Sequence, residues 1–363
     1  YPVPIGVSYN SYLLMDEKTV LLDTADKSVS HQFMENVAHV LGDRDLDYLV
    51  INHMEPDHCA EIPCIMKKYP NVKVVCNAKI QTMITQFFDF EIPEEQLILV
   101  KEGETLNTGK HNLTFVFAPM VHWPEVMVAY EKKEKILFSA DAFGKFGALD
   151  VEDEWDCEAR RYYINIVGKY GAQVQALLKK AATLDIQKIF ALHGPMLTEN
   201  LGYYINKYDI WSSYRPEDEG ILIAYASVYG HTKQAAEKLK EILEVKGAPK
   251  VAITDLARDD MAEAVEDAFR YDRLVLASVT YDGGIFPCME SFIAHLKSKN
   301  YQNRKVAFIE NGSWAPIAAK KMRAELEGLK NLTFADTTVS IKSAMKDADI
   351  KQLEALADEL LVK

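Results

Sequence analysis

Short apolar runs recur along the first half of the chain, and each is followed at once by polar residues. The runs span residues 48–51, 113–118, 135–140 and 188–192. Runs of this length that are rich in Val, Ile, Leu and Phe and end at polar residues are typical of β-strands. We expect helices between them, for example over residues 174–184, so the first half is predicted to mix strands with helices.

The second half has a different pattern, in which near-continuous apolar runs alternate with amphipathic stretches. The apolar runs span residues 221–226, 251–255, 274–278, 306–309 and 332–337, and residues 233–245 form an amphipathic stretch. This alternation predicts a parallel, doubly wound sheet with helices on both faces. A polar stretch that contains Pro216 and Gly220 separates the halves and predicts two domains, residues 1–214 and residues 220–363.

The residues that follow the first-half runs are of types that bind metals. They are His53, Glu55, Asp57 and His58 after the first run, and His122, Asp141 and His193 after the other three. A single histidine after a strand is more often an ordinary surface or core residue, and this alternative applies to each histidine taken alone. Four coincident strand ends favour one shared site for two metals, in which Asp141 is the natural bridging ligand.

Glu55 indicates which metal such a cluster would prefer. The segment resembles the metal-binding motif of zinc hydrolases of the metallo-β-lactamase superfamily, which carry histidine where this chain has Glu55. A carboxylate oxygen suits a harder, redox-active ion such as iron better than it suits zinc. The sequence therefore favours a redox centre with two metal ions.

Composition and charge exclude several other classes of function. The chain has 363 residues, a net charge of −13 at pH 7 and a pI near 5.3, which argues against a nucleic-acid partner. No apolar run of about 18 residues occurs, so no membrane span is predicted. Five cysteines without a C-x-x-C pair predict reduced thiols and a cytoplasmic protein. Because the chain begins at Tyr1 and not at Met, we expect a preceding segment.

Other polar residues near these motifs have ordinary interpretations. Cys59, next to the histidine cluster, is interpreted as a small residue that packs a helix. His31 and His39 are placed on the surface of a predicted helix, and His111 and His295 lack a metal-binding context.

Three loops of the second half have the features of a flavin site. Residues 227–232 follow the first apolar run and open a helix, where unpaired N–H groups and hydroxyls favour a phosphate. Residues 278–284 and 311–314 follow the third and fourth runs, and each loop places an aromatic side chain beside glycine, which suits a flat ring. The alternatives are a plain helix cap by Thr232 and aromatic residues that only cover the end of the sheet.

Neither a Walker A sequence nor G-x-G-x-x-G is present, so flavin mononucleotide, FMN, is the predicted ligand of these loops. The residues expected to contact it are Ser227, Val228, Tyr229, Gly230, His231, Thr232, Ser278, Val279, Thr280, Tyr281, Asp282, Gly283, Gly284, Asn311, Gly312, Ser313 and Trp314.

Together these motifs resemble those of the flavodiiron proteins, also called A-type flavoproteins. The resemblance rests on the pattern His53-x-Glu55-x-Asp57-His58, on residues 122–124, 141–144 and 193–195, and on the second half. It implies a two-domain chain of α+β and α/β architecture, with a metallo-β-lactamase-like αββα sandwich followed by a flavodoxin-like doubly wound parallel sheet. It also implies FMN and two Fe ions in an oxo- or hydroxo-bridged diiron centre.

The resemblance further implies a ligand set and an activity. The set is His53, Glu55 and His122 for one iron, Asp57, His58 and His193 for the other, with Asp141 bridging, and His58 is the ligand in which family members differ. The implied activity is reduction of dioxygen to water, of nitric oxide to nitrous oxide, or of both. A rubredoxin-like electron donor and a head-to-tail homodimer or dimer of dimers are also implied. The competing hypothesis is a metal-dependent hydrolase of the metallo-β-lactamase fold with a fused flavodoxin domain.

Three features depart from the family pattern. Residues 314–316, Trp-Ala-Pro, stand where the family has a glycine-rich run, so fewer backbone donors are expected near the flavin ring. The stretch from Asp141 to His193 is shorter than usual, which implies a trimmed loop over the metal pocket. No pair of C-x-x-C motifs follows the flavodoxin-like half, so electrons are expected from a separate protein.

Three aromatic residues lie close to the ligands in sequence. Trp123 adjoins a predicted ligand and is expected near the flavin of a partner chain in the dimer. Tyr162 and Tyr163 are candidates to support the ligands, but the sequence favours ordinary core packing for both.

Overall fold

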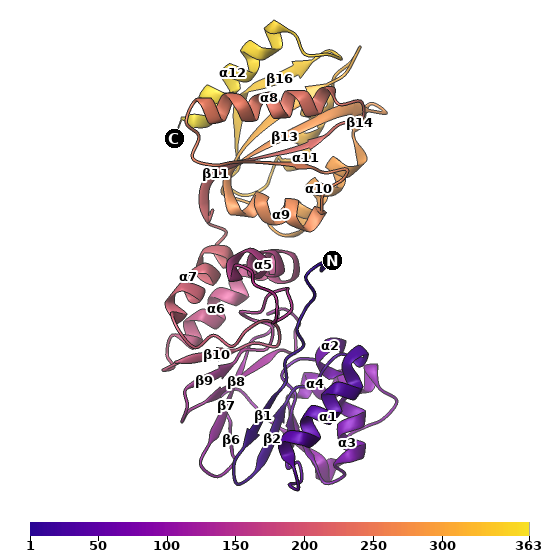
Figure 1. The fold of residues 1–363 in the computed structure, drawn as a ribbon, viewed down its shortest axis with the longest axis vertical. Helices are drawn as coiled ribbons and strands as arrows, with labels where there is room; N and C mark the ends of the chain where they lie inside the picture. The colour runs from indigo at the N-terminus through magenta and orange to yellow at the C-terminus, as the bar shows by residue number, and fades with distance from the viewer. Residues whose placement is uncertain (363) are drawn as a thin grey trace. The chain divides into compact units, whose positions relative to one another are not determined.

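The computed structural model describes residues 1–362. The chain divides into two compact units, one that spans Val3–Asp209 and one that begins at Ile210, and Figure 1 shows the elements of each. The division falls within helix α7 (Leu201–Ser212). We keep the domain limits of residues 1–214 and 220–363 as a proposal.

The first unit contains two five-stranded sheets, with the strand orders β1-β2-β3-β4-β5 and β10-β9-β8-β7-β6. In the first sheet β1 is antiparallel to β2 and the other pairs are parallel. In the second sheet only β9 and β10 are parallel. The strands are β1 (Tyr12–Met15), β2 (Thr19–Leu22), β3 (Tyr48–Val50), β4 (Lys73–Cys76), β5 (Leu97–Leu99), β6 (Thr105–Asn107), β7 (Asn112–Phe117), β8 (Met127–Glu131), β9 (Ile136–Phe138) and β10 (Lys188–Phe190).

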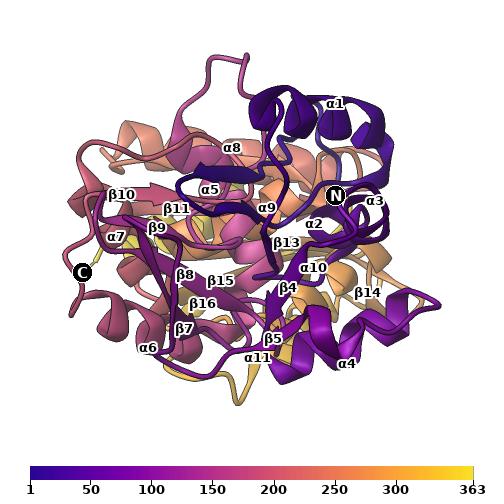
Figure 2. The ribbon, with the colours of Figure 1, turned by 90° about the horizontal axis from the view of Figure 1, so that it is seen from below.

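Helices lie outside both sheets of this unit. They are α1 (Ser30–Leu41), α2 (Pro56–Cys59), α3 (Ile62–Lys68), α4 (Ala78–Phe87), α5 (Trp155–Tyr162), α6 (Gly171–Ala181) and α7. The 3₁₀ turns η1 (Lys27–Val29), η2 (Glu94–Gln96) and η4 (Gly168–Tyr170) and the π-turn η3 (Tyr163–Val167) complete the set. Two views agree that α1, α3 and α4 lie beside the first sheet and that α6 and α7 lie beside the second (Figures 1 and 2).

The apolar faces of the two sheets form one core. Val50 and Val75 of the first sheet and Phe115 and Met127 of the second are each fully buried in the same cluster. Burial of this apolar surface between the sheets is the main driving force for their association. The layers therefore form the expected αββα sandwich.

The strands that lead to the metal-binding residues are shorter than the apolar runs that predict them. The run over residues 135–140 yields only β9, because Lys135 and Ala140 both adopt left-handed backbone conformations, with φ of 59° and 50°. β3 ends at Val50, since the N–H of Asn52 turns away from the ladder to donate to Asp23 Oδ1 at 2.7 Å. The residues after each strand are thus free to turn toward a common point at the rim of the sheets.

The second unit is a parallel sheet of order β12-β11-β13-β15-β16, with the short strand β14 antiparallel to β13. Its strands are β11 (Asp218–Ala226), β12 (Val251–Asp255), β13 (Tyr271–Tyr281), β14 (Gly284–Ile285), β15 (Lys305–Asn311) and β16 (Thr333–Ile341). Its helices are α8 (His231–Val245), α9 (Met261–Arg270), α10 (Pro287–Ser298), α11 (Ala318–Leu326) and α12 (Asp347–Leu361). Taken in chain order without the β14 hairpin, the strands run 2-1-3-4-5, which is the flavodoxin-like order.

Several predicted element ends differ from those in the structure, and β16 and α6 are two examples. β16 continues to Ile341, four residues beyond the predicted end, because its buried positions Val339 and Ile341 alternate with more exposed ones at the edge of the sheet. Helix α6 begins at Gly171 and ends at Ala181, where a tighter turn from Lys180 to Thr183 terminates it. None of the helices in the described part of the chain combines the length and apolar character needed to cross a bilayer.

Candidate metal centre and flavin site

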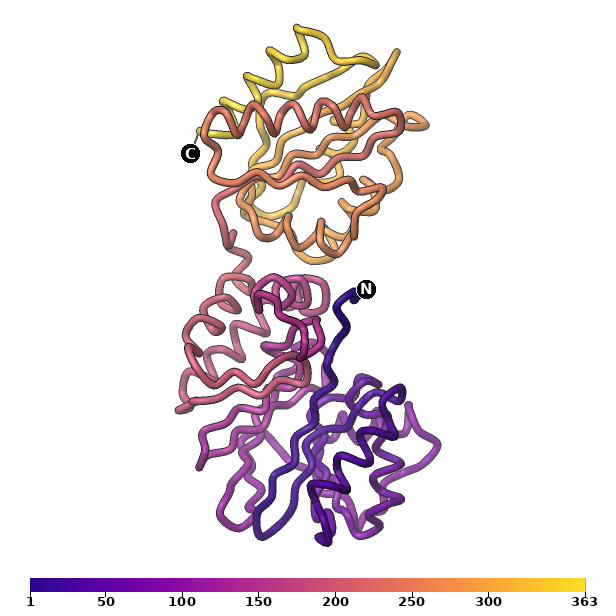
Figure 3. Tube along the Cα trace, viewed as in Figure 1, coloured from indigo at the N-terminus to yellow at the C-terminus, as the bar shows by residue number. Residues whose placement is uncertain are grey.

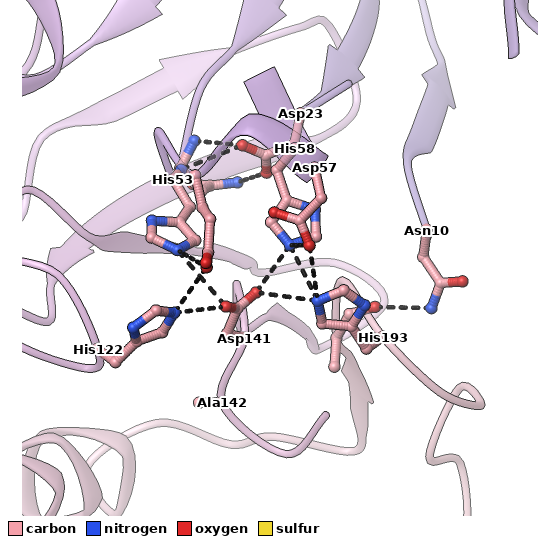
Figure 4. A network of polar contacts seen from close by, with 12 residues as sticks. Asn10, Asp23, His53, Asp57, His58, His122, Asp141, Ala142 and His193 are labelled. Carbon is pink, nitrogen blue, oxygen red and sulfur yellow. Dashed lines mark hydrogen bonds and ion pairs between the residues drawn. The ribbon is translucent and has the colours of Figure 1, made fainter. Parts of the chain in front are cut away.

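The structure brings the predicted metal ligands together at one rim of the first unit (Figure 4). They come from both sheets. The loop after β3 and helix α2 supply His53, Glu55, Asp57 and His58. The β7–β8 loop supplies His122, and the loops after β9 and β10 supply Asp141 and His193. They form two groups, and within each group the candidate ligand atoms all lie within 4.8 Å of one another.

The first group combines His53, Glu55, His122 and Asp141. Glu55 Oε2 lies 2.8 Å from His122 Nε2 and 3.3 Å from His53 Nε2. Asp141 Oδ2 lies 3.1 Å from His122 Nε2 and 3.5 Å from His53 Nε2. Two imidazole nitrogens and two carboxylate oxygens therefore converge, which is a donor set that suits iron.

The second group combines Asp57, His58 and His193. Asp57 Oδ2 lies 3.3 Å from the Nε2 atom of each histidine, and the two Nε2 atoms are 3.1 Å apart. Two imidazole nitrogens this close need either a proton between them or a cation that both can bind. Asp57 Oδ1 is buried and has no hydrogen-bond partner among the described residues. These residues fit a second metal ion.

Asp141 lies between the two groups. Its Oδ2 faces His122 and His53, while its Oδ1 lies 3.1 Å from His58 Nε2 and 4.0 Å from His193 Nε2. Its side chain is almost completely buried. One carboxylate that offers a different oxygen to each group has the geometry of a bridging ligand.

The carboxylates of the two groups favour nearby positive charge, as the pKa values of the candidate ligands show. Burial opposes ionisation of Glu55, yet hydrogen bonds from His122 and His53 outweigh it and lower the pKa of Glu55 to about 2. Burial also opposes ionisation of Asp141, but the nearby histidines hold its pKa well below the usual range. Burial lowers the pKa of His122, but its hydrogen bonds with Asp141 and Glu55 raise it to about 9. Protons supply the positive charge when no metal is bound, and a bound cation would replace them.

The predicted flavin loops line one cavity of about 630 Å³ at the carboxyl ends of the parallel strands in the second unit. Helix α8 opens with Gly230 at the N-cap position, in a left-handed conformation with φ of 90°. Ser227 Oγ accepts the N–H of Gly230 at 3.1 Å, which fixes the loop, and Thr232 is buried in the first helical turn. Because Gly230 occupies the cap position, the alternative that Thr232 is a plain helix cap is wrong. The first N–H groups of α8 have no acceptor within the helix, so they suit a phosphate.

The other two loops are tied to each other and to the sheet. Thr280 Oγ1 accepts the N–H groups of Ile317 and Ala318 at 2.9 and 3.1 Å, so the second loop holds the start of α11. A Cβ atom on Gly312 would lie 3.0 Å from Pro316 Cα, so the close return of the chain requires glycine there. Residues 312–316, which include the Trp-Ala-Pro segment that departs from the family pattern, therefore form a tightly packed turn.

Aromatic side chains border this cavity. Tyr229 and Trp314 are each 90% exposed and Tyr281 is 45% exposed. Asp282 and Gly283 both have positive φ, 47° and 69°, and form the tight turn between β13 and β14 that sets Tyr281 at the rim. A flat ring placed between these side chains would cover much of their surface, so the cavity fits a flavin.

Comparison with known proteins decides the family. Residues 7–194 match the family model described as ODP family beta lactamase, and residues 222–340 match the flavodoxin domain model. The chain is 30% identical over 355 residues to the anaerobic nitric oxide reductase flavorubredoxin of Vibrio vulnificus, a match that covers 94% of this chain and 70% of that protein. The chain belongs to the flavodiiron protein family. This flavodiiron protein is accordingly an oxidoreductase with FMN and a diiron centre.

Further relatives are similar to this chain over nearly its whole length. The uncharacterized protein MJ0732 of Methanocaldococcus jannaschii is 29% identical over 364 residues, which cover 97% of this chain and 90% of that protein. The rubredoxin oxygen:oxidoreductase of Desulfovibrio gigas has the same fold, with a TM-score of 0.90 and 26% identity over 99% of this chain and 91% of that one. The structure of the flavodiiron protein of Giardia intestinalis matches with a TM-score of 0.92 and 23% identity. The match covers 99% of this chain and 91% of that one. The predicted metallo-β-lactamase-like and flavodoxin-like folds are confirmed.

The structure also places residues beside the metal groups that the sequence did not indicate. Glu125 is fully buried, and its Oε1 lies 2.8 Å from His53 Nδ1. His193 Nδ1 donates to the backbone carbonyl of Ser8 at 2.7 Å, in the N-terminal segment that begins the indigo trace of Figure 3. Asp23 accepts the N–H groups of Asn52 and His53. Asp23 directly follows the apolar run of β2, so the same strand-end pattern could have indicated it, whereas Glu125 follows Pro124 in the β7–β8 loop and has no such signal.

The remaining sequence interpretations have mixed outcomes. Tyr162 is buried, as expected for a core residue, but its hydroxyl also donates to Asp141 Oδ2 at 2.9 Å, so core packing alone does not describe it. Tyr163 is buried against Tyr208. The Trp123 ring lies in T-shaped arrangements with the His53 and His122 rings, with centroid distances of 5.4 and 6.1 Å.

The residues interpreted as ordinary are so in the structure. Cys59 is buried and donates to the carbonyl of Met54, while His31 and His39 are exposed on α1. His111 pairs with the buried Glu131, and His295 bonds the Ser291 carbonyl within α10.

Proposed function

We propose that this flavodiiron protein reduces dioxygen to water, nitric oxide to nitrous oxide, or both, in the cytoplasm. The observation that carries the proposal is the position of Asp141, whose two oxygens face the two groups of candidate ligands. We assign His53, Glu55 and His122 to one iron, Asp57, His58 and His193 to the other, and Asp141 to both. The names of the Vibrio and Desulfovibrio relatives, which refer to nitric oxide and oxygen, support both substrates.

The electron count supports the same reaction. When bound, two irons and FMN supply up to four electrons, which matches the four needed to reduce dioxygen to water and exceeds the two needed for two molecules of nitric oxide. A centre that delivers electrons in this number need not release partly reduced oxygen.

Two side chains at the candidate metal centre, Tyr162 and Glu55, have defined protonation states at neutral pH. Burial and the carboxylates of Asp141, Glu55 and Asp57 raise the pKa of Tyr162 well above its usual range. Its hydroxyl therefore keeps its proton and donates it in a hydrogen bond beside both groups. Glu55, with a pKa of about 2, stays an anionic acceptor at neutral pH. The chain thus provides a fixed hydrogen-bond donor to Asp141 and anionic carboxylates that would offset the positive charge of the irons.

We further propose that electrons arrive from a separate rubredoxin-like protein and that the chain works as a head-to-tail homodimer or a dimer of dimers. The name of the Desulfovibrio relative supports the donor. FMN and iron would then be brought together across two chains, with Trp123 near the flavin of the partner chain.

The test is to measure gas consumption by the purified protein. We expect two irons and one FMN per chain, and electrode-measured removal of dioxygen or nitric oxide that depends on added reductant and reduced rubredoxin. Water without hydrogen peroxide, and nitrous oxide by gas chromatography, are the expected products. Protein with full iron and FMN that removes neither gas would contradict the proposal.

A further inference from the structure

The two groups of candidate ligands offer the same number and kinds of metal-binding side chains. Each has two imidazoles and one carboxylate of its own, and both share Asp141. The direct donors alone would therefore give two similar irons. A difference between the irons must come from the groups that hold these ligands.

On the first side the holding group is a carboxylate. Glu125 Oε1 lies 2.8 Å from His53 Nδ1 and accepts the N–H of Met54 at 2.9 Å. The side chains of His53 and Glu125 are both fully buried, and Glu125 Oε2 has no hydrogen-bond partner among the described residues. The negative charge of Glu125 is thus directed mainly onto one imidazole, in surroundings where water screens it little.

On the second side the holding groups are neutral. His193 Nδ1 donates to the Ser8 carbonyl at 2.7 Å, and Ser8 Oγ accepts the N–H of Gly194 at 2.7 Å. His58 Nδ1 is buried and has no hydrogen-bond partner among the described residues. Among the described residues, no carboxylate other than the candidate ligands is hydrogen-bonded to a histidine of this group. The buried Asp23 interacts electrostatically with His58, but its side chain accepts hydrogen bonds from Asn52 and from the His53 N–H.

We propose that Glu125 is a positioning residue that makes the two irons unequal. Its charge makes His53 a stronger donor and lowers the reduction potential of the iron held by His53, Glu55 and His122. The iron held by Asp57, His58 and His193 is then reduced first and the other second. This inference rests on the ligand assignment under the proposed function.

One contact acts in the opposite sense and is weaker. The Tyr162 hydroxyl donates to Asp141 Oδ2, the oxygen that faces the first group, and so withdraws electron density from that side. That bond has a neutral donor, whereas a bond from an imidazole to a carboxylate places a full negative charge beside the ligand. The effect of Glu125 therefore exceeds that of Tyr162.

The test is a reductive titration of the FMN- and iron-loaded protein and of its E125Q variant. The amide oxygen of glutamine can still accept from His53 and from Met54, so the substitution removes charge while it keeps both hydrogen bonds. In the parent we expect two resolved one-electron steps and a strong electron paramagnetic resonance signal from the one-electron-reduced diiron centre. In E125Q the second step should move toward the first, and the maximal signal should fall.

Two variants separate charge from structure. E125D keeps the charge and should restore the separation of the steps. E131Q removes another buried carboxylate that pairs with a histidine, His111, outside both groups, and should leave both steps as in the parent. If E125Q bound two irons and showed the parental separation, the inference would be wrong.

The outcome remains decisive if E125Q does not retain iron. In that case the parent alone tests the inference, because a parental centre that is reduced as two equivalent irons would overturn it. Protein that binds no iron, or that reacts with neither gas, would instead overturn the proposed function. Gas reduction with unchanged reduction steps in E125Q would overturn only the role of Glu125.

Discussion

Glu55 and His122 lie 67 residues apart in sequence, yet Glu55 Oε2 is 2.8 Å from His122 Nε2. Glu55 lies at the start of α2, after strand β3 of one sheet, and His122 lies in the β7–β8 loop of the other. The αββα arrangement thus builds an oxygen-containing donor set from two layers. The carboxylate at this position is what separates the chain from the zinc hydrolases that its first half resembles.

Replacing Glu55 with histidine should convert the donor set toward nitrogen. Iron content and gas reduction should fall together in E55H, because imidazole favours zinc more than the carboxylate does. Metal analysis and activity on the same preparation check this. The matched control is E35H, which alters a glutamate with a side chain 68% exposed on α1. Full iron content and full activity in E55H would contradict the claim that the Glu55 carboxylate selects iron.

Removing Asp141 should affect both metal positions. In D141A we expect iron at both positions to be lost, since each group uses one oxygen of this carboxylate. In H193A the loss should fall mainly on the position held with Asp57 and His58. Mössbauer spectra of ⁵⁷Fe-loaded variants distinguish the two outcomes. Equal loss from both positions in H193A, with one retained in D141A, is the opposite of what we expect.

Replacing Thr232 with alanine should weaken FMN binding. Loss of one hydroxyl donor to a phosphate costs roughly 1.5–3 kcal/mol, or about ten- to a hundredfold in affinity. Fluorescence titration of the FMN-free protein measures this change. T82A, which removes an exposed hydroxyl on α4 in the other unit, is the control. Iron content should stay unchanged, and parental FMN affinity in T232A would refute the phosphate assignment.

Adding one methyl group at Gly312 should disturb the third flavin loop. The new Cβ would lie 3.0 Å from Pro316 Cα, so the loop must shift, at a cost of about 1–3 kcal/mol. We expect weaker FMN binding in G312A. The control is G202A, where a Cβ atom would meet nothing within 4 Å. FMN binding that weakens equally in both variants would show that the loop contact is not the cause.

Transfer between chains can be tested by mixing inactive variants. An H53A chain keeps its flavin site and a T232A chain keeps its metal site, so one centre of a hybrid dimer should combine intact iron with intact flavin. Under limiting FMN we expect the mixture to regain activity that neither variant has alone. Hybrid dimers that form, as shown by differently tagged chains, and yet remain inactive would rule out transfer between chains.

The sequence predicts the metal ligands better than it predicts the residues that hold them. His53, Asp141 and His193 each follow an apolar run within a few residues, so the chemistry and the strand pattern point to the same positions. Glu125 and Ser8 contact their histidines across sequence separations of 72 and 185 residues. Neither has an unusual residue type or pattern, so only the folded chain identifies them.

The ends of the strands are likewise harder to predict from the sequence than their positions. β12 has the predicted bounds, Val251–Asp255, whereas β16 was predicted to end at Thr337 and continues to Ile341. The prediction relies on near-continuous apolar runs, but polar and apolar side chains alternate over the last four residues of β16, from Thr338 to Ile341, so the pattern does not include them. β12 is the other edge strand of this sheet, and the central strand β13 (Tyr271–Tyr281) extends three residues beyond the predicted 274–278 at each end, so apolar continuity locates the strands but does not fix their ends.

The most direct measurement is a single-turnover reaction of the fully reduced protein with dioxygen or nitric oxide in a stopped-flow spectrometer. With two irons and one FMN per chain, we predict rapid reoxidation of the flavin, about one dioxygen consumed per chain and no hydrogen peroxide, because four electrons reduce dioxygen to water. Parallel measurement with nitric oxide should yield nitrous oxide. Slow flavin reoxidation with peroxide release, at the same rate in iron-free protein, together with no reaction with nitric oxide, would contradict the account.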